Sequence, residues 1–225
     1  MKTKKIVLFI VEGISDQTSL ALILSKLIKS ENVRFHIVNG DITSDCYTAV
    51  GNAMTKVNEQ IKRFLGSNFI KKTDILEVVH LVDTDGAYVG NECIEEGDCE
   101  GFIYSPNSIK AKRIEAVIQR NQKKSSILSR LSTCPEISGI PYSMYFFSCN
   151  LEHVLHNVCN MDDDKKDKVA EEFADTFYDK EEEFIEFIGN NEFAVPGDFK
   201  ETWEFIKRDN NSLKRYCNFH LFFSK

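Results

Sequence analysis

A short apolar run that ends in two acids constrains this chain more than any other segment. Residues 75–82 read Ile-Leu-Glu-Val-Val-His-Leu-Val, and Asp83, Thr84, Asp85 and Gly86 follow directly. Such a run, closed by a turn residue, is typical of a buried strand in a parallel sheet. In an extended segment Asp83 and Asp85 point to the same side, where two carboxylates can bind a divalent cation. The alternative is that both acids only begin the next loop.

A second buried-strand pattern also ends in an acid. Residues 5–11 are mostly apolar, and Glu12 and Gly13 follow, where glycine permits a sharp exit from the strand. Apolar residues at helical spacing then predict a helix capped by Ser15 or Asp16. If the two strands are adjacent in one parallel sheet, their terminal acids lie at the same edge, where α/β sheets bind ligands.

The rest of the chain continues an α/β pattern. Periodicity predicts a strand at 33–38, a helix at 46–64, a loop at 86–107, a helix at 108–131, a strand at 142–147 and acidic helices between 162 and 204. We therefore expect an α/β domain at residues 1–157, with a mainly parallel four-stranded sheet and flanking helices, and an acidic helical C-terminal extension at residues 158–225 packed on it. The apolar residues 221–223 form either an edge strand or a docked tail.

Composition points to a reducing, cytoplasmic compartment. The N-terminal apolar stretch is too short to span a membrane and lacks a cleavage site. The seven cysteines form no C-x-x-C pair, so reduced thiols are expected. A zinc site at Cys93 and Cys99 would need two further ligands that the sequence does not supply.

One segment reverses the charge of the chain. The net charge of −7 argues against a protein that coats nucleic acid with its whole surface. Between residues 110 and 130, however, there are seven basic residues and only one acidic residue, Glu115. A local basic face could bind phosphates there, although a solvated helix carries similar side chains. The candidate nucleic-acid-binding residues are Lys112, Arg113, Arg120, Lys123 and Lys124.

The ordered pair of acidic motifs resembles the Toprim domain of topoisomerases, primases and related nucleases. The likeness rests on Glu12-Gly13-x-Ser-Asp16 after the first strand and Asp83-Thr84-Asp85 after a later one, and it covers roughly residues 4–155. It is strongest to nucleases of the overcoming-lysogenisation-defect type and to small standalone Toprim proteins of phage-defence systems. The resemblance implies a Toprim-like, Rossmann-like fold.

The resemblance also implies a set of site residues. A serine and a glutamate after a later strand would correspond to Ser148 and Glu152, and a C-terminal basic residue, Lys214 or Arg215, would offset charge on the scissile phosphate. Surface exposure is the alternative for both bases. One or two Mg²⁺ or Mn²⁺ ions would be held by carboxylates. The expected ligands are Asp83, Asp85 and Glu12, the last being a ligand or the general base, with Asp16 and Glu152 at a second ion.

The expected function is a metal-dependent nuclease that cleaves DNA or RNA in phage defence or another mobile-element system. A separate ATPase or defence-system subunit is an expected class of partner. Without helicase, zinc-ribbon or ATPase motifs, topoisomerase and primase activities are not expected. Two alternatives stay open: a non-catalytic Toprim-fold module that binds or senses nucleic acid, and a metal-dependent nucleotide-sugar transferase, in which Glu12 has no role.

Overall fold

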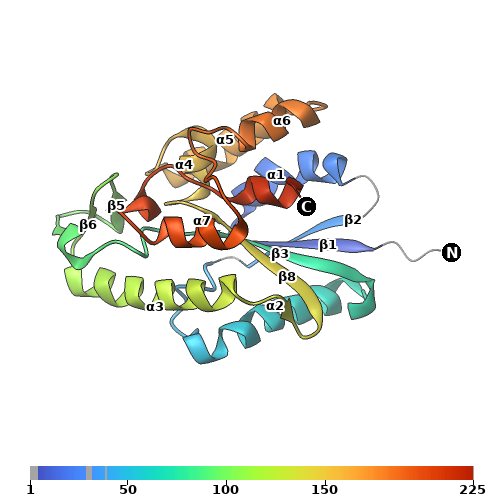
Figure 1. Ribbon diagram of the computed structural model, residues 1–225, viewed down its shortest axis with the longest axis horizontal. Helices are drawn as coiled ribbons and strands as arrows, with labels where there is room; N and C mark the ends of the chain where they lie inside the picture. The colour runs from blue at the N-terminus through green and yellow to red at the C-terminus, as the bar shows by residue number, and fades with distance from the viewer. Residues whose placement is uncertain (1–4, 29–31, 39, 225) are drawn as a thin grey trace. The chain divides into compact units, whose positions relative to one another are not determined.

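The computed structural model describes residues 5–28, 32–38 and 40–224, and these form an α/β protein (Figure 1). The main sheet has the strand order β2-β1-β3-β8-β7. Strands β2 and β3 both pair with β1 in parallel, whereas β7 pairs with β8 antiparallel, so the sheet is mixed. The strands are β1 (Ile6–Val11), β2 (Asn32–Ile37), β3 (Ile75–Asp83), β7 (Glu136–Ile137) and β8 (Ile140–Phe147).

The sheet contains five strands, and the predicted number of four is wrong. The additional strand is the two-residue β7, joined to β8 by the pair Ser138 and Gly139, whose φ angles are 54° and 74°. Two consecutive residues with positive φ make a tight hairpin turn. The turn lets Ile137 pair with Ile140. A strand of two residues is too short to produce a periodic signal in the sequence.

The chain divides into two compact units that are each built from three segments. The first comprises Met1–Leu81, Ile127–Tyr145 and Asp163–Phe184, and the second Val82–Ser126, Phe146–Asp162 and Ile185–Lys225. The division predicted at residues 157 and 158 stays a prediction.

The first unit is a sheet covered on both faces. Every residue of β1 is buried, as expected for a strand with a neighbour on each side. Helices α1 (Ile14–Leu27) and α5 (Asp163–Thr176) pack together on one face, and α2 (Ala53–Asn68) lies on the other (Figure 1). The predicted strands at 5–11, 33–38 and 75–82 are confirmed within a residue or two.

The helix predicted at 46–64 begins later. A 3₁₀ turn at Val50–Asn52 precedes α2, and residues 46–49 belong to a loop. Asn52 explains the delay, because its side chain accepts a hydrogen bond from Ala49 N (2.7 Å) and donates one to Tyr47 O (3.1 Å). Side-chain bonds of this kind stabilise a turn in competition with a helix.

The second unit contains a small sheet that the sequence did not reveal. Strands β4 (Ile94–Glu96), β5 (Phe102–Tyr104) and β6 (Ile109–Ala111) are ordered β4-β6-β5, and α3 (Ile114–Ser132) follows. The loop predicted at 86–107 contains strands β4 and β5, and the helix start predicted at 108 is wrong, because α3 begins at Ile114. A compact apolar core underlies the sheet; it includes Val89, Ile94, Ile109, Val117 and Leu213.

The C-terminal third is helical, as predicted, up to its end. Its helices are α4 (Leu151–His156), α5, α6 (Glu181–Ile188) and α7 (Phe199–Ile206). Residues 221–223 lie in a 3₁₀ helix, Phe219–Ser224, rather than in an edge strand. Phe219 anchors this segment, since it is fully buried and its ring centroid lies 5.9 Å from that of Phe147. None of the described helices combines the length and apolar character needed to cross a membrane.

Candidate active site

In the first unit, the turn after β1 is fixed by Asp16. Its Oδ2 atom accepts hydrogen bonds from Glu12 N (3.1 Å) and Gly13 N (3.0 Å). Gly13 is the N-cap of α1, so the cap predicted at Ser15 or Asp16 is corrected: Asp16 acts from the third helical position. These two bonds hold Glu12 in one backbone geometry at the end of β1. Hydrogen bonds from backbone N–H groups to an ionised carboxylate are stronger than those between neutral groups.

In the second unit, Thr84 is the structural centre of the Asp-Thr-Asp motif. Its side chain is fully buried. Thr84 N donates to Phe147 O (3.0 Å), Thr84 Oγ1 donates to Ser212 O (2.8 Å), and the same oxygen accepts from Cys149 N (3.0 Å). One residue therefore joins the segment after β3 to the segment after β8 and to the C-terminal tail. These bonds explain in structural terms why a threonine stands between Asp83 and Asp85.

The turn continues through two residues in the left-handed region. Asp85 has φ 49° and Gly86 has φ 66°. Asp85 N donates to Cys149 O (2.8 Å), and Gly86 N donates to Ser212 O (3.1 Å). A Cβ atom at Gly86 would lie 2.6 Å from Leu213 Cδ2, so only glycine fits there. Aspartate is among the residues that tolerate this conformation.

The Asp85 carboxylate is paired with a buried lysine. Lys124 Nζ lies 2.5 Å from Asp85 Oδ2, and the lysine side chain is 0% exposed against 22% for the aspartate. Tyr104 donates its hydroxyl to Asp85 Oδ1 at 3.4 Å. Burial, followed by the charge of Asp85, raises the pKa of Tyr104 well above its usual value, so the phenol stays protonated.

Arg120 completes this cluster. Its Nη2 donates to Asp85 O (2.7 Å) and its Nη1 donates to Tyr104 OH (2.9 Å), while Nη1 lies 3.9 Å from Asp85 Oδ2. Arg120 and Lys124 are four residues apart on α3, so both reach the same place. Asp85 thus has two cations beside it from the protein itself.

This arrangement bears on the predicted metal site. The carboxylates at Glu12, Asp16 and Asp83 have the oxygen donor chemistry that Mg²⁺ prefers. Lys124 already supplies a positive charge beside Asp85, and the role of Asp85 as a metal ligand stays a prediction. Within residues 5–28, 32–38 and 40–224, no three His, Cys, Asp or Glu side chains are grouped closely enough to hold a metal.

The predicted carboxylates fall in both units. Glu12 and Asp16 belong to the first unit, and Asp83, Asp85 and Glu152 belong to the second. Their convergence on shared ions stays a prediction. That prediction assumed that the two strands are parallel neighbours, and they are: β1 and β3 pair in parallel up to Ile10 and His80.

Residues in the segment after β8 also form hydrogen bonds that stabilise the fold. Ser148 Oγ donates to Asn211 O (2.7 Å), and Glu152, in the first turn of α4, is 7% exposed. Asn150 caps the helix by accepting a bond from His153 N (2.8 Å). Burial, and then the charge of Arg215, lowers the pKa of His153. The hydroxyl of Ser148 therefore supports the tail in the described geometry.

Both C-terminal bases have partners within the protein. Arg215 donates from Nε and Nη2 to Val154 O, at 3.0 and 2.8 Å, and its guanidinium lies over the ring of Phe193. Lys214 Nζ donates to Asp209 O at 2.7 Å. Both side chains are half-buried rather than fully solvated. Their predicted catalytic role stays a prediction.

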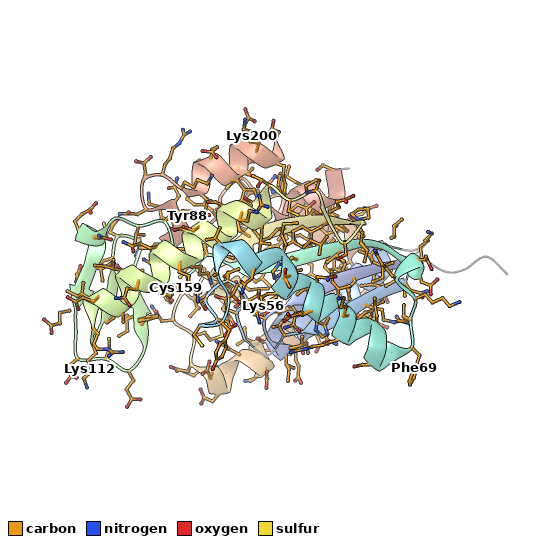
Figure 2. All side chains as sticks on the ribbon, turned by 90° about the horizontal axis from the view of Figure 1, so that it is seen from below. Lys56, Phe69, Tyr88, Lys112, Cys159 and Lys200 are labelled. Carbon is orange, nitrogen blue, oxygen red and sulfur yellow. The ribbon has the colours of Figure 1, made fainter. Side chains whose placement is uncertain are left out.

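The predicted phosphate-binding residues do not share one face. Lys112 and Arg113 are exposed ahead of α3, and Lys112 projects from the ribbon there (Figure 2). Lys123 is half-buried, and Arg120 and Lys124 are turned inward to Asp85. Arg120 and Lys124 were predicted to be exposed and to contact phosphates, whereas in the structure both side chains are directed toward Asp85.

The sequence carried a signal for the inward lysine. Lys124 falls in the buried stripe of α3, together with Val117, Asn121 and Leu128, at spacings of three and four residues. A lysine in such a stripe needs an acid partner. Tyr104, by contrast, lies in a strand that was not predicted, so no sequence signal identified it.

Comparison of the chain with models of protein families, with curated proteins and with solved structures found no match. The function is therefore inferred from the chain's own residues.

Proposed function

We propose that this protein is a divalent-metal-dependent nuclease with a Toprim-like active site at the carboxyl ends of β1 and β3. The supporting observation is the strand order. The chain passes from β1 to β2 on one side and then crosses to β3 on the other side of β1. Ligands of open α/β sheets bind at such a reversal, outside the carboxyl ends of the strands. Glu12 directly follows β1, and Asp83 is the last residue of β3.

Each residue receives a role that its surroundings support. Glu12 and Asp83 are the proposed metal ligands, with Glu12 also a candidate general base. Asp16 positions Glu12 through the two backbone bonds. A bound Mg²⁺ would supply charge compensation for the phosphate oxygens and lower the pKa of an attacking water. Asp85, neutralised by Lys124, is assigned a positioning role in the turn that carries Asp83.

We propose that the nucleic acid binds to those predicted basic residues that are exposed in the structure. Lys112 and Arg113 are the proposed phosphate contacts, because both are exposed in the structure. Lys112 lies 3.7 Å from Asp98, but both side chains are more than three-quarters exposed, so a phosphate can replace the acid at little cost. Replacing both bases with glutamine should reduce the slope of log affinity against log salt by nearly one unit for each phosphate that is no longer bound.

The direct test is a cleavage assay. Purified protein is incubated with plasmid, single-stranded DNA and total RNA, in Mg²⁺, in Mn²⁺ and in EDTA. The proposal expects cleavage of at least one nucleic acid with metal and none with EDTA. Absence of cleavage from every substrate in both metals would refute it.

A second candidate function is a non-catalytic module that binds or senses nucleic acid. The observation that favours it is the pairing of Asp85 with Lys124, because one of the expected ligand carboxylates is neutralised by the protein. Binding of single-stranded nucleic acid without cleavage in either metal, and with the same affinity in EDTA, would support this alternative.

A further inference from the structure

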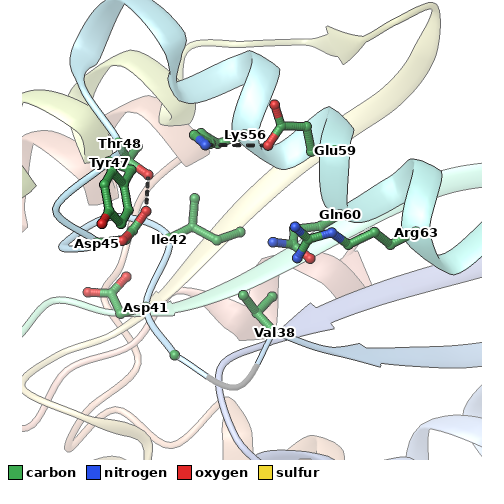
Figure 3. Close-up of a pocket in the computed structure, with 11 residues that line it drawn as sticks. Val38, Asp41, Ile42, Asp45, Tyr47, Thr48, Lys56, Glu59, Gln60 and Arg63 are labelled. Atoms are coloured by element: carbon green, nitrogen blue, oxygen red, sulfur yellow. Dashed lines mark hydrogen bonds and ion pairs between the residues drawn. The ribbon is translucent and has the colours of Figure 1, made fainter.

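A pocket in the first unit has no role in the proposed function. It lies in the connection between β2 and α2 and has a volume of about 310 Å³ (Figure 3). This is at the lower end of the range of about 300–1,000 Å³ for small-molecule sites. A ligand the size of one nucleotide is therefore a better match than a dinucleotide.

The pocket is held open by its own loop. Gly40 N donates to Glu12 O (3.2 Å), which ties the loop to the end of β1. Thr43 donates from N and Oγ1 to Asp41 Oδ1, at 2.6 and 2.5 Å. Asn52 fixes the backbone at Tyr47 through the bond to its carbonyl. A loop fixed in this way loses little conformational entropy when a ligand binds.

One end of the pocket combines an aromatic ring with acidic acceptors. Tyr47 is 78% exposed, and Figure 3 shows its ring beside the carboxylate of Asp45, with Asp41 on the same side. Asp45 Oδ2 accepts from Thr48 Oγ1 at 3.1 Å, and a carboxylate can accept several further bonds. This end suits a planar group that carries N–H donors.

The other end carries a cation. Arg63 projects from α2 on the opposite side of Ile42 (Figure 3), and among the described residues its guanidinium makes no hydrogen bond or ion pair. Lys56, also on α2, is paired with Glu59 at 3.4 Å. The planar fork of arginine matches a phosphate group. Apolar Ile42 lies between the two ends (Figure 3), and Val38 also lines the pocket.

We propose that this pocket binds a purine nucleotide, with the base stacked on Tyr47 and the phosphate on Arg63. Aromatic rings stack on bases of any sequence, and carboxylates accept from base N–H groups. Guanine fits best, because its N1–H and N2–H₂ can both donate to Asp45. The proposal does not depend on nuclease activity.

The test is calorimetric titration of the full chain with guanosine monophosphate, inosine monophosphate, guanosine and ribose 5-phosphate. Guanosine monophosphate should bind tightest, and removing either the base or the phosphate should weaken binding about tenfold or more. Inosine monophosphate, which lacks the N2 amino group, should bind severalfold more weakly. A guanine-ended oligonucleotide with a 5′ phosphate, titrated in parallel, shows whether the site takes a strand end or only the free nucleotide.

Variants assign the two ends separately. Arg63→Gln should weaken the monophosphate about tenfold and leave guanosine unchanged, whereas the neighbouring exposed Lys62→Gln should alter neither. Tyr47→Ala should weaken both ligands and Tyr47→Phe should retain them; Tyr178→Ala is the matched control at an exposed tyrosine outside the pocket. Asp45→Asn should abolish the preference for guanosine over inosine monophosphate. Absence of nucleotide binding at millimolar concentration, or binding that Tyr47→Ala and Arg63→Gln leave unchanged, would overturn the proposal.

Discussion

Two aspartates that follow strands are held in opposite ways. Asp16, in the first unit, accepts two backbone N–H bonds, from Glu12 and Gly13, at the start of α1. Asp85, in the second unit, meets the buried ammonium of Lys124 and the carbonyl-bound guanidinium of Arg120. Bonds to backbone N–H groups fix the position of a carboxylate, whereas an ion pair with a buried lysine also compensates its charge. Aspartate therefore serves a backbone turn in one unit and a buried ion pair in the other.

The strongest test of this contrast is to neutralise Asp85. Asp85→Asn removes the carboxylate charge that is paired with the buried ammonium of Lys124, which should cost about 3 kcal/mol in the free energy of unfolding. Denaturant titration measures this change. The matched control is Asp98→Asn, which breaks the exposed pair with Lys112 and should change stability little.

The double variant Asp85→Asn with Lys124→Met separates pairing from packing. It should recover most of the stability that the single variant lacks, because the buried ammonium is removed together with the carboxylate charge that it pairs with. If the single Asp85 variant is as stable as the wild type, the aspartate is not held by the lysine and the contrast fails.

The turn beside Asp85 is tested by Gly86→Ala. The new Cβ would lie 2.6 Å from Leu213 Cδ2 and 2.9 Å from Ile109 Cδ1, in a residue with φ 66°. We expect a loss of about 2–3 kcal/mol from the combined steric and conformational cost. Gly101→Ala is the control: its φ is 73° but no atom lies within 4 Å of the added Cβ, so thermal denaturation should show the smaller, conformational part alone.

Asp16→Ala probes the other side of the comparison. It removes the acceptor of the Glu12 and Gly13 N–H groups, and capping changes of this kind cost about 1 kcal/mol. Asp16→Asn keeps an oxygen acceptor and should be closer to the wild type in stability. If Asp16→Asn nevertheless loses Mn²⁺ affinity in titration calorimetry, the charge of Asp16 serves the metal and not only the turn.

The smallest effect concerns His153. Burial and the charge of Arg215 lower its pKa, so the folded protein binds a proton there less readily than the unfolded chain. Its contribution to stability is therefore full above the unfolded pKa, about 6.5, and declines as the pH falls below that value. NMR titration should place the His153 transition below that of an unfolded peptide; a transition at or above about 6.5 would contradict the burial argument.

The main sheet was largely predictable from the sequence. Strands β1, β3 and β8 each carry a run of apolar residues that is mostly buried, and burial of this kind leaves a plain signal. The shortest strands leave no such signal, because alternation over two or three residues cannot be distinguished from a loop. These are the two-residue β7 and the three-residue β4, β5 and β6. The late start of α2 depended on the side-chain bonds of Asn52, which only the structure reveals.

The sequence was enough to select candidate acidic residues, but it did not identify the side chains that pair with them. Glu12, Asp16 and Asp83 were selected because they follow buried strands, and their role as metal ligands stays a prediction. The pairing of Asp85 was not found, since it depends on the rotation of α3 that turns Lys124 inward and on Tyr104 from an unpredicted strand. Charge counting placed Lys124 with the exposed bases, whereas its place in the apolar stripe of the helix would have placed it inside.

The most direct test of the proposed metal site compares the cleavage rate of Asp83→Asn with that of the wild type in Mg²⁺ and Mn²⁺. Glu182→Gln, which changes an exposed acid on α6, is the control for removal of one negative charge. If Asp83 is a metal ligand, the wild type and the control should show metal-dependent cleavage. Asp83→Asn should then cleave about a hundredfold or more slowly, with the fold intact by circular dichroism. Equal cleavage by Asp83→Asn and the wild type would contradict the assignment.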